Sequence, residues 1–134
     1  MTRRIFGSIL VVGGLVTAGA SLQAHHSLAG VYDMKAEKEV TGTLTKIQFV
    51  NPHGSLSMEV KNADGTVKEW VFTTGSATTL ADRGIGKSSN VLKPGDTITA
   101  KFIPARNGNP LGFLKSVTLS DGKVIAISNG NPND

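Results

Sequence analysis

From residue 38 onward, apolar and polar residues alternate with the period of β-strands. A first strand is predicted over 38–49 and stops at a turn formed by 51–54. A second follows over 56–60, and its core face is predicted to carry Leu56, Met58 and Val60. The Asp-Gly pair within 62–65 predicts a hairpin turn, after which 67–73 returns as a third strand. The pattern therefore predicts a three-stranded meander.

A short helix interrupts the strands. Ser76 has the side chain of a helix N-cap, the run to Ala81 predicts about two helical turns, and Gly84 or Gly86 is expected to end them. Strand patterns then resume, and further strands are predicted over 97–103, 113–119 and 124–127.

This order of elements is that of an OB-type barrel. We expect a mainly β fold, a small OB-like five- to six-stranded antiparallel barrel with one short helix between strands three and four. A meander or sandwich with an incidental helix is the alternative. Closing the sheet removes exposed strand edges, which suits a small domain that has no cysteine and hence no disulfide.

The first residues have the order of a secretory signal peptide. Arg3 and Arg4 form a positive start, an apolar core follows, and small residues lead to Ala24, after which cleavage is predicted. A membrane anchor is the alternative, but glycine, serine and threonine dilute the apolar stretch. The predicted organisation is a signal peptide over 1–24, an extended N-terminal segment over 25–37, an OB-like barrel over 38–128 and a frayed tail over 129–134.

Composition narrows the functional classes. The formal net charge of +4 includes two arginines of the predicted leader, and the lysines are spread along the chain rather than clustered. Aromatic residues are few, at 5% of the chain, and most occupy predicted core positions. Nucleic acid is therefore not an expected partner, and a periplasmic or secreted monomer without a stable membrane anchor fits best.

The three histidines carry the sharpest chemical hypothesis. Two of them, His25 and His26, directly follow Ala24. Cleavage there gives one residue both a free amine and an imidazole. Together they form a chelate that binds copper(II) more tightly than the other first-row divalent ions. The amine with His26 and a deprotonated intervening amide is a second possible ligand set.

The third histidine, His53, lies in the turn after the first predicted strand. One interpretation is structural, with the ring bonded to a backbone carbonyl. The other makes it the third ligand of the copper site, because the roughly 13 residues between His25 and the first strand span up to ~40 Å.

A binding module without metal is the alternative function. OB barrels bind ligands on the face of strands two and three and in the loops after strands one and four. In the second of these loops, over 104–112, Arg106 and Asn107 are the expected polar contacts for a small molecule, a glycan or a protein. No catalytic set accompanies them, so an enzyme is the least favoured class.

Short motifs along nearly all of the predicted mature chain resemble a family of small exported bacterial proteins classed as a domain of unknown function. In chain order they are His25-His26-Ser27-Leu28, Tyr32-Asp33, Val40-Thr41-Gly42-Thr43-Leu44, Asn51-Pro52-His53, Asp64-Gly65, Trp70, Gly75-Ser76, Leu80, Arg83-Gly84, Leu92-Lys93-Pro94-Gly95-Asp96 and Ser116-Val117-Thr118-Leu119-Ser120-Asp121-Gly122. The resemblance implies export, a small β-barrel and shared His-His and Asn-Pro-His motifs, and it brings no established activity. The chain departs from similar proteins at Ile85, where they often have tryptophan.

Overall fold

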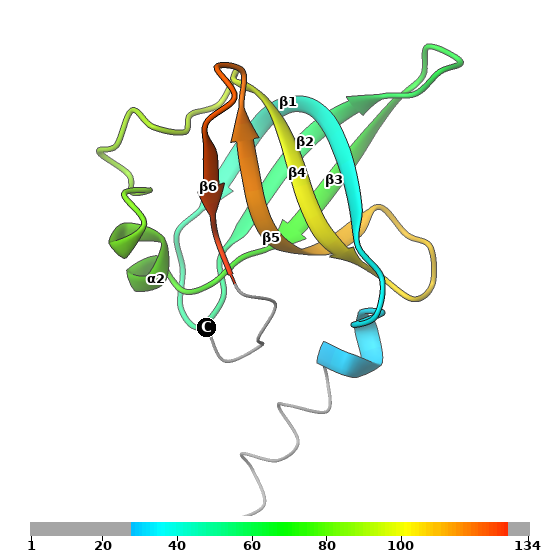
Figure 1. The fold of residues 1–134 in the computed structure, drawn as a ribbon, viewed down its shortest axis with the longest axis horizontal. Helices are drawn as coiled ribbons and strands as arrows, with labels where there is room; N and C mark the ends of the chain where they lie inside the picture. The colour runs from blue at the N-terminus through cyan, green and yellow to red at the C-terminus, as the bar shows by residue number, and fades with distance from the viewer. Residues whose placement is uncertain (1–27, 129–134) are drawn as a thin grey trace, which may run out of the picture.

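The computed structural model describes residues 28–128, which form a small barrel with a short helix beside it (Figure 1). The strands and the helix follow the predicted order closely, and their bounds are β1 (Lys38–Gln48), β2 (Ser55–Lys61), β3 (Val67–Thr73), α2 (Ala77–Asp82), β4 (Thr97–Pro104), β5 (Leu111–Leu119) and β6 (Val124–Ala126). The tail over 129–134 lies outside the described residues.

The sheet closes on itself. Its strand order is β3-β2-β1-β4-β5-β6, and an additional pairing joins β3 to β5. This is the predicted OB-like connectivity, a closed barrel of five strands with β6 as an extra strand. Neighbouring strands are antiparallel except in the closing pair, where residues 71–73 of β3 run parallel to 111–113 of β5.

The barrel interior is filled by one apolar cluster, in which Phe72 and Phe102 are fully buried with ring centroids 4.9 Å apart. Trp70 packs against both rings from a half-buried position. Gly112 lies where the barrel closes, and a Cβ there would collide with the Phe102 ring. The glycine therefore lets the closing strand approach the core.

β1 contains a bulge that a strict period of two does not predict. Leu44 pairs with Met58 and Lys46 with Ser57, so one extra residue, Thr45, stands between them. The inward face consequently changes phase, and both Leu44 and Ile47 pack into the core.

The predicted helix caps are confirmed. The Ser76 side chain accepts the backbone N–H of Thr79, and Gly84 follows the helix in the left-handed region with φ +78°. Within residues 28–128 no helix is long and apolar enough to cross a bilayer.

The described part of the N-terminal segment, residues 28–37, differs from the extended conformation predicted for it. Residues 28–31 form a helical turn, closed by a 2.8 Å hydrogen bond from the Tyr32 N–H to the Leu28 carbonyl. Tyr32 then packs with Ile103 and Phe113 in a second apolar cluster. Burial of this aromatic ring against β4 and β5 favours a folded-back segment over a free extended one.

Candidate functional site

The turn between β1 and β2, residues 51–54, lies against the end of β3 and the start of α2 (Figure 1). We call it the His53 turn. Gly54 exchanges two backbone hydrogen bonds of 3.0 Å with this region, one to Gly75 and one from Thr74. The Asn51 side-chain oxygen accepts the Ala77 N–H at 3.1 Å, at the start of α2. The chain segments that carry the Asn-Pro-His and Gly-Ser motifs, far apart in sequence, thus contact each other.

Gly54 is required at this contact. A Cβ on it would collide with the Gln48 carbonyl oxygen and lie 2.8 Å from the Thr74 hydroxyl oxygen. The turn therefore packs as closely as backbone allows, and His53 is held by its neighbours on both sides.

The His53 ring is half-buried, and its Nδ1 lies 3.3 Å from the carbonyl oxygen of Thr74. Because a carbonyl oxygen only accepts hydrogen bonds, Nδ1 is the donor. In the neutral ring the other nitrogen, Nε2, then keeps its lone pair. Metal-binding histidines use this same device, in which a backbone carbonyl fixes the tautomer and the ring orientation.

The N-terminal segment is anchored beside the end of β3, next to the His53 turn. The Tyr32 hydroxyl lies 2.8 Å from the Thr73 hydroxyl, within hydrogen-bond distance, and Thr73 immediately precedes the residue that holds His53. A β-bridge joins Tyr32 to Ala105, and the Asp33 N–H donates to the Pro104 carbonyl at 2.9 Å. The segment preceding β1 is therefore fixed at the end of the barrel that carries the His53 turn.

Arg106, predicted as a ligand contact, bonds to this segment. Its backbone N–H donates to the Val31 carbonyl and its Nε donates to the Ala29 carbonyl, both at 2.9 Å. Asn107 is exposed, and its side-chain oxygen accepts the Asn109 N–H at 3.1 Å within the loop. The structure thus gives both residues bonds within the chain, and the pair lies on the loop that holds the N-terminal segment rather than on the His53 turn.

Glu37 ties the base of the segment to the barrel. It pairs with Lys115, and its carboxylate lies 3.2 Å from the Lys101 ammonium nitrogen. Hydrogen bonds from Lys115 and then Lys101 hold the pKa of Glu37 below its usual value. This cluster is charge-paired at the surface. It ties the residue just before β1 to β4 and β5.

Ala24, His25 and His26 lie outside the described residues. Within residues 28–128 no group of three or more His, Cys, Asp or Glu side chains is arranged to hold a metal ion. A metal site that uses His53 therefore needs ligands from beyond this range.

Comparison with known proteins gives one match. A protein-family model described as a family of unknown function, DUF6152, matches residues 12–132. The chain belongs to this family. No curated protein and no solved structure matches the chain. DUF6152 membership covers the His53 turn, the N-terminal segment and the whole barrel, and it leaves the activity to be argued from the residues themselves.

Three residues of this site escaped sequence reasoning. Tyr32, Thr73 and Thr74 determine where the N-terminal segment and the His53 ring lie. The Tyr-Asp motif marks the first of them in the sequence, but pairing it with Thr73 depends on how the barrel closes.

Proposed function

We propose that the protein is exported, cut after Ala24, and binds a metal ion, copper in preference, through the new amine and side chain of His25 together with His53. The observation that carries this proposal is the hydrogen bond from His53 Nδ1 to the Thr74 carbonyl, which leaves Nε2 with a lone pair in the neutral ring. An amine and two imidazoles form a nitrogen ligand set of the kind that copper(II) favours.

The anchored segment shortens the tether that the sequence alone suggested. Leu28 is the first described residue, and His25 stands three residues before it. Three residues span about 10 Å at most, so the His25 amine lies within about 10 Å of Leu28. Tyr32 holds the segment to Thr73, next to the residue that bonds His53. His26 is the alternative second imidazole, bound with the intervening amide deprotonated.

The test is a copper(II) titration of protein that begins at His25, compared with the same protein acetylated at its N-terminus. Acetylation removes the amine as a ligand and changes no side chain. We expect affinity to fall at least tenfold, equivalent to about 1.4 kcal/mol. A chain extended by one residue is a poor control, because it places His26 third from a free amine and creates another chelate. Equal affinity of the free and acetylated forms would rule out the amine-based site.

The contribution of His53 needs a variant that keeps the turn. His53→Asn retains an N–H donor for the Thr74 carbonyl and removes Nε2, whereas His53→Ala removes both. We expect both variants to lose copper affinity and one imidazole nitrogen in the electron paramagnetic resonance spectrum. His26→Ala serves as the matched histidine substitution. If the spectrum loses a nitrogen only in His26→Ala, the ligand is His26 and the His53 assignment is wrong.

The export claim has its own measurement. N-terminal sequencing of the full-length chain recovered from the periplasm of a Gram-negative host is expected to begin at His25. Retention in the cytoplasm, or a different N-terminal residue, would contradict the proposed processing.

A further inference from the structure

β6 differs from the other strands in its pairing. Within residues 28–128 it is the strand with a single neighbour, β5, whereas each strand of the closed barrel has two or more. Its antiparallel register joins Thr118 to Val124 and Ser116 to Ala126. The second side of β6 is thus a sheet edge along the whole strand.

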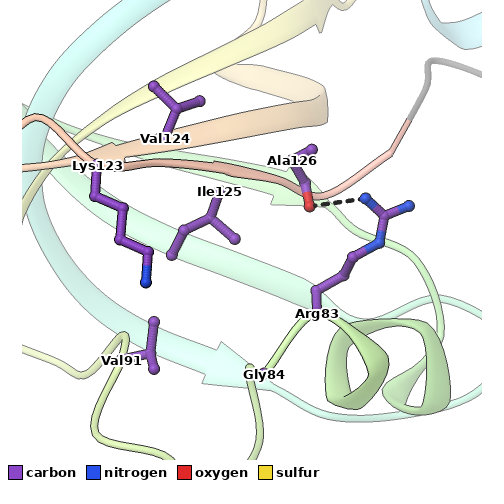
Figure 2. A pocket seen from close by; sticks show the side chains of 7 residues that line it. All are labelled: Arg83, Gly84, Val91, Lys123, Val124, Ile125 and Ala126. Atoms are coloured by element: carbon purple, nitrogen blue, oxygen red, sulfur yellow. Dashed lines mark hydrogen bonds between the residues drawn. The ribbon is translucent and has the colours of Figure 1, made fainter.

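The hydrogen-bond phase shows which backbone groups face this edge. The Leu119 N–H donates to the Lys123 carbonyl and the Ile127 N–H donates to the Lys115 carbonyl. Because bonded and non-bonded pairs alternate in an antiparallel ladder, Val124 and Ala126 direct their N–H and C=O groups away from β5. Of these groups the Ala126 carbonyl accepts the Arg83 Nη1 at 3.2 Å (Figure 2).

A cleft of about 390 Å³ runs beside this edge, lined by Arg83, Gly84, Val91, Lys123, Val124, Ile125 and Ala126. Figure 2 shows the Lys123 and Ile125 side chains pointing toward Val91, with Arg83 entering from the end of α2. Val124 points to the opposite side, as strand alternation requires. The cleft therefore has an apolar floor with one cation toward each end.

Arg83 and Lys123 form no ion pair within residues 28–128, and they differ from the other unpaired lysines there because both line the cleft. Lys101 and Lys115 share Glu37, and Lys93 pairs with Asp96. Within residues 28–128 no carboxylate forms an ion pair with the side chain of Arg83 or Lys123, and none lines the cleft. The nearby Asp121 carboxylate instead accepts the backbone N–H of Lys123 at 2.9 Å.

We propose that the β6 edge binds an extended acidic peptide segment of another protein, which adds a strand to β6. The N–H and C=O of Val124 and the N–H of Ala126 supply strand pairing, and the cleft supplies side-chain selection. Side chains two residues apart share a face of a strand, so the matching segment has the pattern acidic-x-apolar-x-acidic. Its acids face Lys123 and Arg83, and its apolar residue covers Val91 and Ile125. The two unpaired cations argue against a second copy of this chain as the occupant, because two such edges would repel each other.

The probe is a labelled peptide, acetyl-Thr-Glu-Thr-Val-Thr-Glu-Thr-amide, measured by fluorescence anisotropy with the whole protein. We expect binding with a Kd below about 1 mM, weakened by salt. The same peptide with lysine in place of glutamate tests charge, and the acidic peptide with its central amides N-methylated tests backbone pairing. Loss of binding in both comparisons is expected. Binding that survives N-methylation would overturn strand addition, and equal binding of the basic peptide would overturn the charge assignment.

Charge-reversal variants locate the binding site. Arg83→Glu and Lys123→Glu are each expected to weaken the acidic peptide at least tenfold, while Lys87→Glu, an exposed residue that does not line the cleft, leaves it unchanged. Amide resonances of Val124 and Ala126 are expected to shift on titration. Equal loss in all three variants, or no binding by the wild-type protein, would overturn the proposal. Concentration-dependent dimers that vanish on changing β6 would identify a second copy as the occupant instead.

Discussion

The His53 turn and the β6 edge are two loop-proximal regions of one barrel that treat backbone polar groups in opposite ways. At the His53 turn, Gly54, Thr74 and Gly75 satisfy one another, and the remaining Thr74 carbonyl orients the histidine ring. At the β6 edge, Val124 and Ala126 turn their backbone groups outward, and a single exposed arginine covers one carbonyl. Backbone groups that are hydrogen-bonded to one another hold the His53 side chain in one geometry. Backbone groups without a partner favour the binding of another strand that supplies the missing hydrogen bonds.

The largest expected effect comes from disturbing the satisfied region. Gly54→Ala forces a Cβ against the Gln48 carbonyl and is expected to lower the free energy of unfolding by about 1–3 kcal/mol. Urea unfolding followed by the fluorescence of Trp70, the one tryptophan, measures it. Gly86→Ala is the matched control, since nothing lies within 4 Å of its Cβ position. Equal effects of the two substitutions would contradict a tightly packed His53 turn.

A smaller effect is expected where the N-terminal segment joins this region. Tyr32→Phe keeps the aromatic packing on Ile103 and Phe113 but removes the hydroxyl contact with Thr73. The expected loss in the free energy of unfolding is about 1 kcal/mol. A double-mutant cycle with Thr73→Val isolates this contact, and a coupling of about 0.5 kcal/mol or more is expected. Simple additivity of the two substitutions would show that the hydroxyl pair does not anchor the segment.

The smallest effect is expected at the β6 edge. Arg83→Ala removes an exposed hydrogen bond whose acceptor water can satisfy, so the free energy of unfolding is expected to change by less than about 0.5 kcal/mol. Thermal and urea unfolding of the variant measure this directly. A loss above about 2 kcal/mol would place Arg83 among the residues that hold the fold together. The cleft would then no longer contrast with the His53 turn.

Much of the fold was predictable from local pattern. Alternation and the turn at 62–65 located β2 and β3, and Ser76 with Gly84 bounded α2. The order of three strands, a helix and further strands indicated the barrel, which the β3–β5 pairing confirms. The prediction of an extended segment before β1 was wrong in part, because the Tyr32 ring is buried against the barrel.

Some features of the candidate site were likewise predictable from the sequence, and others were not. The sequence by itself determined that the histidines are few, that two follow Ala24, and that His53 lies in a turn beside a strand, because these follow from residue order and turn chemistry. Only the tertiary structure decided that Thr74 orients the His53 ring, that Arg106 holds the N-terminal segment, and that β6 presents an open edge. Those facts depend on contacts between residues distant in sequence, which form when the strands pair and β3 meets β5 to close the barrel.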